Sequence, residues 1–328
     1  LSNLEYLIPF IHFALTSEDI SNLAYRLMWK TALKKIYLPK LIELKEKLAK
    51  LAKKHSNIPL LSLTHGQPAT PTTIGKEINI FVNRLARQIR QLEQHQLTGK
   101  LNGATGTFAA HEIAYPEINW LDFAKKFIAY LGLEPNLLTT QVEPADSLTE
   151  SFQIISRTNN ILIDLTRDFW LYISRGIFLQ QKNEAEVGSS TMPHKINPIN
   201  FENAEGNLGL ANAYFNHLSS TLPISRLQRD LSGSTVIRNI GVPLAHSLLA
   251  IKQTIFGLDK IQVNQEKTNQ ELEEHWEILA EAVQTLLRKY GDSQAYEKIK
   301  NLTRGEKIDK DTIKKIIIES GLPEPEKQ

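Results

Sequence analysis

The segment ILIDLTRDFWLYISRGIFL, residues 161–179, constrains the fold most, because it is apolar on nearly every side of a helix. A helix that is apolar all round is buried all round. We therefore predict a central helix over residues 147–181, packed among other helices. A single small bundle cannot bury a helix that is apolar on all sides. We therefore expect several chains to pack their helices together in one assembly.

Helical periodicity dominates the rest of the chain as well. Residues 17–54 begin with a cap-like Ser and acids in the first turn, and leucines then recur at three- and four-residue steps. Further helices are predicted over 74–98, 198–220 and 235–258, the last with Pro243 inside it as a kink. No segment alternates apolar and polar residues for long enough to predict a sheet. The predicted fold is therefore all-α, a bundle of long helices.

The C-terminal part carries shorter amphipathic helices. ELEEHWEILAEAVQTLLRKYG (271–291) is one, with Gly291 as its predicted C-cap, and DKDTIKKIIIESGLP (309–323) is another. This change of pattern predicts a small helical domain over 257–328. It would follow a central helical-bundle domain over 15–256.

Length and composition narrow the function classes. The chain has 328 residues, enough for two domains, and its net charge of +2 does not suggest a nucleic-acid partner. It has no cysteine, which excludes disulfides, thiolate catalysis and cysteine-ligated metals and fits a reducing compartment. No apolar run is long enough to span a membrane. We expect a cytoplasmic protein with no membrane partner.

Three polar segments interrupt the helical pattern: LSLTHGQPATPTTIGKE (61–77), EVGSSTMPHKINPINFENAEGN (186–207) and RLQRDLSGSTVIRN (226–239). Each has an ordinary explanation. A lone His65 is usually a loop histidine satisfied by backbone groups, Gly-Ser-Ser can be a turn, and surface arginines are usually solvated. Taken singly, no segment predicts a site.

Together, the features of the second segment favour anion binding. Asn197 followed by Pro198 predicts a helix start, with an N-cap side chain and a proline at the first helical position. Free N–H groups at a helix N-terminus favour anions. Gly188 provides a hinge and Lys195 a cation. This arrangement suits a carboxylate that gains charge during a reaction.

The eleven residues GSSTMPHKINP (188–198) resemble the signature loop of the fumarase, aspartase and argininosuccinate lyase superfamily. His194, at the variable position of that loop, is similar to the adenylosuccinate lyase and carboxymuconate cycloisomerase branches. Five further segments resemble adenylosuccinate lyases, in a consistent order: TSEDI (16–20), THGQPATPTTIGKE (64–77), TTQVEP (139–144), INFENAEGN (199–207) and RDLSGSTVIRN (229–239). The resemblance also implies a preceding N-terminal domain, of which residues 1–14 would be the remnant.

The resemblance implies a β-elimination in purine nucleotide biosynthesis. Fumarate leaves adenylosuccinate to give AMP, and leaves succinylaminoimidazole carboxamide ribotide (SAICAR) to give the carboxamide ribotide (AICAR). The intermediate carbanion spreads onto a carboxylate, so the site needs fixed positive charge and donors. The family pattern makes Ser189 the general base. It makes His65 the general acid, since imidazole can hold and release a proton near neutral pH.

The family pattern also implies the residues that hold the succinyl group. Lys195 would stabilise the serine oxyanion and, with Asn197, hold the carboxylate that gains charge. Thr16 and Ser17 would bind the succinyl carboxylates. Gln141 would contact the substrate near the leaving nitrogen.

The third segment would hold the phosphate of the nucleotide. Arg229 and Arg238 carry guanidinium groups that can pair with phosphate oxygens in a bidentate manner, and Ser234 adds a hydroxyl. Three adjacent or weaker assignments complete the expected substrate-binding set: Ser190, Asn203 and Thr235.

The resemblance implies no cofactor and no metal. Glu184 and Glu186 lie near the signature loop, but two acids on a hinge are more often solvated than bound to Mg²⁺. The family forms homotetramers in which each active site is built from three subunits. The small-molecule partner would be the nucleotide substrate, and we expect the loop 183–193 to be mobile without it.

Two alternatives stay open. Another lyase of the superfamily, such as argininosuccinate lyase or the cycloisomerase, would accept a substrate without phosphate, whereas RDLSGSTVIRN suits a phosphorylated nucleotide. A non-catalytic helical oligomer could lose Ser189, His65 or Lys195 without harm, and all three are present. An inactive assembly also remains open if the chain is a truncated form.

Overall fold

The computed structural model describes the whole chain except residues 1, 182–191, 193, 306–307 and 328. The chain divides into two compact units. Unit 1 comprises residues 1–46, 83–168 and 198–259, and unit 2 comprises residues 47–82, 169–197 and 260–328. Among the described residues, no helix is both long and apolar enough to cross a membrane.

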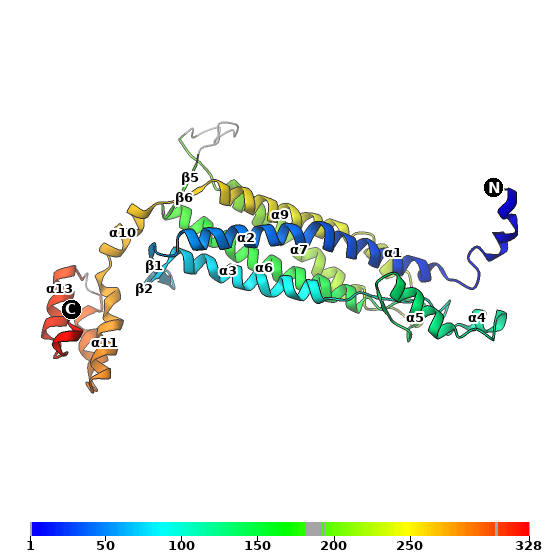
Figure 1. The fold of residues 1–328 in the computed structure, drawn as a ribbon. Coiled ribbons are helices and arrows are strands. Elements are labelled where there is room, and N and C mark those ends of the chain that lie inside the picture. Colours follow the sequence, from blue (N-terminus) through cyan, green and yellow to red (C-terminus); the bar gives the residue numbers. More distant parts are fainter. Residues whose placement is uncertain (1, 182–191, 193, 306–307, 328) are drawn as a thin grey trace. The chain divides into compact units, whose positions relative to one another are not determined.

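Helices make up most of the described chain (Figure 1). The α-helices are α1 (Ser17–Ala32), α2 (Leu38–Lys54), α3 (Ile74–Gln94), α4 (Ala109–Ala114), α5 (Trp120–Tyr130), α6 (Asp146–Ser174), α7 (Ile199–Thr221), α8 (Ser232–Ile237), α9 (Gly241–Asp259), α10 (Gln265–Glu273), α11 (Ala280–Lys289), α12 (Ala295–Thr303) and α13 (Lys310–Glu319). Shorter helical segments are the 3₁₀ helices η1 (Ser2–Phe10), η3 (Trp276–Leu279) and η4 (Glu324–Glu326) and the π-helix η2 (Leu33–Tyr37). The prediction of an all-α fold with long helices is confirmed.

The helix predicted over 17–54 is present but differs in detail. It consists of α1 and α2 joined by the π-helical turn η2. Its N-cap is Thr16 rather than Ser17, and the backbone N–H of Thr16 donates to the carboxylate of Asp19 at 2.9 Å. The side chain of Asp19, at the third helical position, thus accepts a hydrogen bond from the backbone of the cap residue, as in a capping box.

Two of the other predicted helices end or break earlier than expected. α6 ends at Ser174, and three residues separate it from the short strand β5, so the helix does not continue to residue 181. The helix predicted over 235–258 is two helices, α8 and α9, separated by a turn at 238–240. Pro243 lies in the first turn of α9. A proline there loses no intrahelical hydrogen bond, so the predicted kink is absent.

Two further boundaries correct the sequence-based prediction. α7 begins at Ile199 with Pro198 as its N-cap residue, so the prediction of Asn197 as the N-cap is wrong. The carbonyl of Pro198 accepts the first backbone bonds, from Phe201 at 3.0 Å and Glu202 at 3.2 Å. The segment 271–291 is not one helix, because α10 ends at Glu273 and η3 precedes α11.

Three two-stranded ladders were not predicted. β1 (Pro59–Thr64) pairs antiparallel with β2 (Gln67–Thr73), β3 (Thr98–Gly99) pairs parallel with β4 (Glu134–Pro135), and β5 (Phe178–Gln180) pairs antiparallel with β6 (Ile261–Val263). The β1–β2 hairpin lies where a polar loop was expected. Pro68 and Pro71 within β2 hid it from the sequence, because prolines rarely occupy paired strands.

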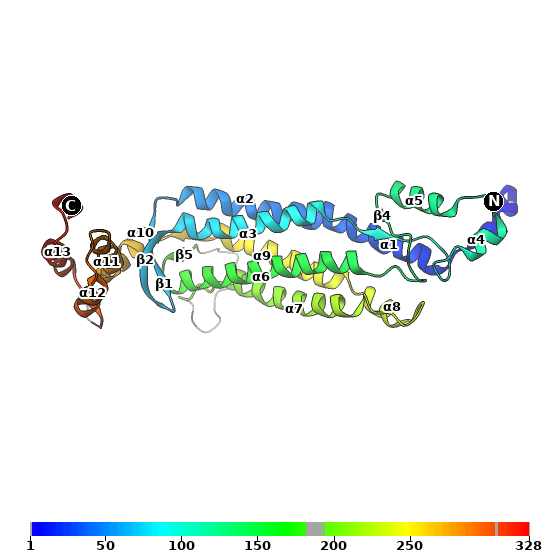
Figure 2. The ribbon, with the colours of Figure 1, turned by 90° about the horizontal axis from the view of Figure 1, so that it is seen from below.

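The core of unit 1 is formed by helices that run side by side, α6, α7 and α9 among them (Figures 1 and 2). Trp29 of α1 is 2% exposed and donates from Nε1 to Oγ of Ser151 on α6 at 2.8 Å. Its ring meets that of Phe152 edge-on, with centroids 5.0 Å apart, and Phe152 packs on Phe215 of α7. Asn159 of α6 links this helix to α7 and α9, because its Nδ2 donates to both Asn212 on α7 and Ser247 on α9. Buried aromatic rings and one shared amide thus fix the helix packing.

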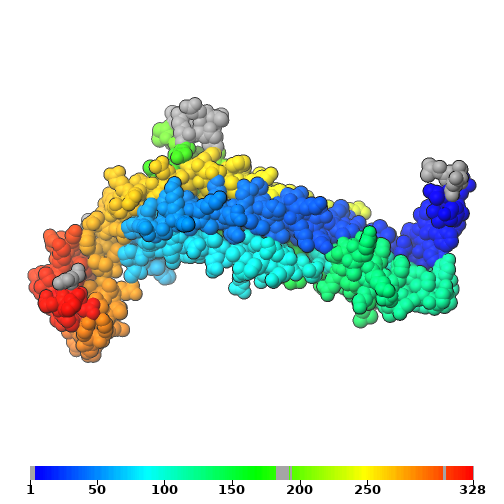
Figure 3. Space-filling model, in the orientation of Figure 1, coloured from blue at the N-terminus to red at the C-terminus, as the bar shows by residue number. Residues whose placement is uncertain are grey.

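Unit 2 holds the β1–β2 hairpin and the C-terminal helices. Figures 1 and 3 show α2 beside α3, and at Gly75 a Cβ would clash with the backbone of Ala52 and Ser56. Arg175 donates to the carbonyl of Leu61 in β1 and pairs with Glu271 of α10 at 2.6 Å. The C-terminal core consists of Val283, Leu287, Ala295, Ile299 and Leu322. The domain boundary at 256/257 stays a prediction.

Candidate active site

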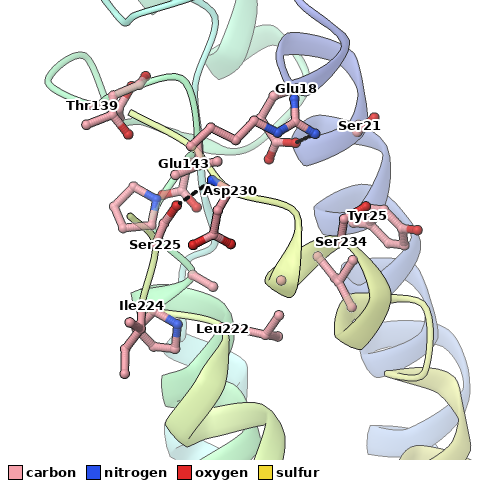
Figure 4. Close-up of a pocket in the computed structure, with 18 of the residues that line it drawn as sticks. Glu18, Ser21, Tyr25, Thr139, Glu143, Leu222, Ile224, Ser225, Asp230 and Ser234 are labelled. Atoms are coloured by element: carbon pink, nitrogen blue, oxygen red, sulfur yellow. Dashed lines mark hydrogen bonds and ion pairs between the residues drawn. The ribbon is translucent and has the colours of Figure 1, made fainter. Parts of the chain in front are cut away.

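Unit 1 contains a cavity of about 590 Å³ that brings together three segments far apart in the sequence. α1 provides one wall with Glu18, Ser21 and Tyr25, and the segment 138–145 provides a second (Figure 4). The segment 222–238, which includes α8, closes the third side. We call this cavity the arginine pocket, because three arginines line it: Arg26, Arg229 and Arg238.

Arg229 joins the three walls of the arginine pocket. Its Nη1 donates to Oγ of Ser17 at 3.2 Å and to Oε1 of Gln141 at 2.9 Å. Its Nη2 lies 3.8 Å from the carboxylate of Glu18. Both N–H groups of Nη1 are therefore used inside the protein, and Nη2 and Nε remain for a ligand.

Gln141 is held from several sides. Its Oε1 accepts from Arg229, its Nε2 donates to the carbonyl of Ala104 at 2.7 Å, and its backbone N–H donates to the carbonyl of Gln228 at 3.2 Å. The Ala104 turn is close because Gly106, with φ of 75°, approaches the carbonyl of Thr139 so closely that a Cβ would clash. A glycine is required there.

A fully buried ion pair supports the start of α1. Nζ of Lys100 lies 2.9 Å from Oδ1 of Asp19, and both side chains have no exposed surface. Asp19 also accepts from the backbone N–H groups of Asn102 at 3.0 Å and Gly103 at 3.3 Å. Burial lowers the pKa of Lys100, and Asp19 opposes that shift. The pair fixes Thr16 and Ser17 against the segment 100–103.

A second buried pair, Arg26 with Glu143, lies in the lining of the arginine pocket. Both side chains are 1% exposed. Glu143 also accepts from the Thr98 hydroxyl at 2.6 Å and from Asn136 at 3.3 Å. Burial raises the pKa of Glu143, while Arg26 and these donors act against the shift.

Asp230 organises the loop between α7 and α8. It accepts from the backbone N–H and hydroxyl of Ser232 at 2.8 and 2.5 Å, and from the backbone N–H and Nη1 of Arg226 at 3.0 Å each. The two bonds from Ser232, followed by that from the Arg226 backbone, lower the pKa of Asp230 to about 2. This carboxylate is therefore ionised at neutral pH. It holds the turn that presents Arg229 and Ser234, which both line the pocket.

In unit 2, His65 lies at the tip of the β1–β2 hairpin. His65 and Gly66 form a two-residue turn between the paired residues Thr64 and Gln67, with φ of 52° and 73°. Positive φ at both positions is the geometry of a type I′ hairpin turn. The His65 side chain is exposed.

The signature loop is described only in part. Ser189 and Ser190 lie outside the described residues, and so does the segment 183–193 whose mobility was predicted, apart from Met192. Lys195 is exposed, and its backbone N–H donates to the carbonyl of Met192 at 3.1 Å. Asn197 is partly buried and precedes the N-cap residue of α7.

The sequence-based assignments separate into three groups. Arg229, Ser234 and Arg238 line the arginine pocket. Ser17 and Gln141 are absent from the lining and are connected to it by their hydrogen bonds from Arg229, and Thr16 is the adjacent helix cap. Thr235 and Asn203 are exposed and absent from its lining. His65, Lys195 and Asn197 belong to unit 2.

Sequence reasoning missed several residues of the pocket. Glu18 and Glu143 stand inside TSEDI and TTQVEP, the same segments that supplied Ser17 and Gln141, but no role was assigned to them. Asp230 follows Arg229 directly. A carboxylate within two residues of Ser17, Gln141 and Arg229 was the available signal. The sequence gave no signal for Lys100, because an isolated lysine is usually exposed.

Two protein-family models together match most of the chain. Residues 7–211 match the family model described as "Lyase", and residues 225–328 match the model described as "Adenylosuccinate lyase C-terminal". Among curated proteins, the chain is 51% identical over 320 residues to an adenylosuccinate lyase of Legionella pneumophila and 51% identical over 318 residues to one of Escherichia coli. These alignments cover 98% and 97% of the chain and 70% of each relative.

Solved structures share the fold. A fumarate lyase from Mesorhizobium superposes with a TM-score of 0.74 at 20% identity, and a 3-carboxy-cis,cis-muconate lactonizing enzyme from Pseudomonas putida with a TM-score of 0.71 at 22% identity. Each superposition covers 89% of the chain, and 66% and 65% of the respective structure. At this identity the likeness establishes the fold. The chain thus spans about two thirds of these structures' length.

Proposed function

The chain belongs to the adenylosuccinate lyase family, and we propose that it releases fumarate from adenylosuccinate, giving AMP, and from SAICAR, giving AICAR. Members of this family are carbon–nitrogen lyases. The observation that supports the nucleotide substrate best is the arginine pocket. There Arg229 is oriented by Ser17 and Gln141 and keeps Nη2 and Nε for a ligand, with Ser234 and Arg238 in the same lining.

The arginine pocket suits one end of this substrate. Two guanidinium groups and a hydroxyl can hold a phosphate dianion through several charge-assisted hydrogen bonds. Thr16 and Ser17, at the N-terminus of α1, are suited to a carboxylate, since backbone N–H groups of a first helical turn favour negative charge. Gln141 has one amide N–H left for the substrate after its bond to Ala104.

The chemical step needs an acid and a base. We assign proton donation to the leaving nitrogen to His65, because its imidazole is exposed at the tip of a tight turn that fixes its backbone. Ser189 is the proposed base, which removes a proton from the carbon next to the carboxylate. Lys195 supplies positive charge for the serine oxyanion, and with Asn197 it holds the carboxylate on which the carbanion's charge spreads.

We also propose a homotetramer with each active site built from three subunits, in the cytoplasm. Exposed apolar side chains support the assembly. On α6, Trp170 is 41% and Leu171 is 52% exposed, within the segment that the sequence predicts to be buried all round. Burial of such residues against other copies of the chain would remove a substantial apolar area from water.

The direct test adds adenylosuccinate to the protein and follows fumarate release. The expected result is turnover that Ser189→Ala and His65→Ala each reduce by orders of magnitude. Argininosuccinate serves as the control substrate, because it lacks phosphate. Turnover of argininosuccinate in preference to adenylosuccinate would identify a different lyase of the superfamily. An assembled protein that turns over neither would be a non-catalytic oligomer.

A further inference from the structure

The carboxylate of Glu18 faces the arginine pocket without a hydrogen bond from any described residue. Its nearest charged partner is Nη2 of Arg229 at 3.8 Å, which is too long for a hydrogen bond. The Glu18 side chain is only 18% exposed, so water compensates it in part. Burying the Glu18 carboxylate in part costs solvation free energy. The protein compensates this cost only with the loose ion pair to Arg229.

The N–H groups of Arg229 that remain for a ligand lie on the side of the guanidinium group nearest to Glu18. Nη1 is used by Ser17 and Gln141, so an incoming anion must bind at Nη2 or Nε. Nη2 is the atom closest to Glu18. An anion bound to this guanidinium therefore lies within a few ångströms of a second negative charge.

We propose that Glu18 sets the anion affinity of the arginine pocket: its carboxylate competes with the bound anion for Arg229, so anion binding is weakened while Glu18 is ionised and strengthened when Glu18 takes up a proton. The inference rests on the proposed function in that it takes this pocket as the phosphate-binding site.

The charges around Glu18 support this competition. Among the described residues, the pocket lining carries three arginines and three carboxylates, namely Arg26, Arg229 and Arg238 with Glu18, Glu143 and Asp230. Arg26 is paired with Glu143, and Asp230 is bound to Arg226 and Ser232. Behind Glu18, Lys100 is paired with Asp19. Glu18 is therefore the carboxylate of the lining whose charge is least compensated.

Burial raises the pKa of Glu18, while Arg229, Arg26 and Lys100 lower it and Glu143 raises it further. The net direction is upward, so Glu18 accepts a proton at a higher pH than an ordinary glutamate. A bound anion adds another negative charge and favours protonation still more. Binding of an anion and protonation of Glu18 are therefore coupled, each favouring the other.

The benefit of this arrangement is selection against small anions. The unfavourable interaction with Glu18 applies to any anion at Arg229. A free phosphate or sulfate has few other contacts to offset it, whereas a nucleotide with a succinyl group has many. Weakening the anion site thus keeps it free of simple ions without preventing substrate binding.

The test measures sulfate binding by calorimetry, because sulfate stays a dianion over the accessible pH range. Glu18→Gln is expected to bind sulfate roughly three- to tenfold more tightly than the wild type at neutral pH, by removal of one charge at this distance. Its affinity should also depend less on pH, while wild-type affinity rises as the pH falls. Glu46→Gln, at an exposed position of α2, controls for net charge and should match the wild type.

The outcomes separate the two proposals. If Arg229→Gln abolishes sulfate binding and Glu18→Gln shows no gain, the role of Glu18 is wrong and the phosphate site stands. If Arg229→Gln binds sulfate like the wild type, or if neither the wild type nor Glu18→Gln binds it, both proposals are wrong. Circular dichroism of each variant checks that it folds.

Discussion

Gln141 accepts a hydrogen bond of 2.9 Å from Nη1 of Arg229, although the two residues are 88 positions apart in the sequence. Gln141 is itself fixed by the carbonyl of Ala104, so the guanidinium group is oriented by a rigid partner. The plane of Arg229 is thereby set before any ligand arrives, which reduces the entropy lost on binding.

Replacement of Arg229 by Lys keeps the charge and removes this fork. We expect KM for adenylosuccinate to rise about tenfold or more, because hydrogen bonds to charged groups contribute about 1.5–3 kcal/mol. Steady-state kinetics measures the effect. Arg90→Lys is the matched control, since Arg90 is an exposed arginine of α3 and is absent from the pocket lining. Equal kinetics for the two variants would contradict the role of Arg229.

The Asp19–Lys100 pair predicts a large effect on stability. Lys100→Met leaves Asp19 as a buried charge without its cation, and we expect the free energy of unfolding to fall by about 3–5 kcal/mol. Chemical denaturation checks this. The exposed pair of Lys126 with Asp122 on α5 is the control, and Lys126→Met should change stability by less than about 1 kcal/mol. A similar loss in both variants would show that burial of the pair is not decisive.

The hairpin turn allows the acid role of His65 to be separated from its structural role. Asn tolerates the left-handed conformation that His65 adopts, so His65→Asn should keep the turn and lose the proton donor. We expect turnover to fall about 10²- to 10⁴-fold with an unchanged melting temperature. His217→Asn, at an exposed position of α7, is expected to be silent in both measurements. Near-normal turnover of His65→Asn would remove His65 from the mechanism.

Two glycines in neighbouring helices should respond in opposite directions to a methyl group. A Cβ at Gly257 of α9 would lie 2.8 Å from the ring of Phe201 on α7, whereas nothing lies within 4 Å of one at Gly209. Gly257→Ala should destabilise the protein by about 1–3 kcal/mol, and Gly209→Ala should stabilise it by up to about 1 kcal/mol. Thermal unfolding compares them. Equal shifts would mean that α7 and α9 do not pack this closely.

His111 predicts a loss of stability in acid. Burial lowers its pKa, with Asp19 and Glu112 acting against the shift and Lys100 adding to it. Because the unfolded chain then takes up a proton at a higher pH than the folded protein, the free energy of unfolding decreases as the pH falls below about 6.5. His111→Gln should lack this part of the decrease, and His217→Gln should retain it. Parallel pH profiles for the wild type and His111→Gln would contradict it.

Sequence patterns predicted single segments better than the relations between them. Ser17, Gln141 and Arg229 were each found from a local motif, but their hydrogen bonds depend on how α1, the segment 138–145 and the α7–α8 loop are packed. Lys100 shows the same limit for a residue whose role was not predicted. Its burial results from tertiary packing around Asp19, and no local pattern distinguishes it from a surface lysine.

Helix ends show why boundaries were less accurate than helix existence. Asn197 has a favoured N-cap side chain, yet α7 begins one residue later. The sequence predicts a kink at Pro243 because it gives no sign of the turn at 238–240, whereas in the structure this proline is well placed in a first helical turn. In both cases the sequence indicated a helix and misplaced the residue at which it begins.

The division into two units also gives each part of the molecule its own fluorescent reporters. Of the four tryptophans in the sequence, Trp29 and Trp120 belong to unit 1, and Trp170 and Trp276 belong to unit 2. Trp29 is nearly inaccessible in the core, so its emission should be blue-shifted and little quenched by iodide as long as unit 1 is folded. Replacing one pair by phenylalanine leaves the other as an intrinsic probe. Each unit can then be followed separately during unfolding, without an added dye.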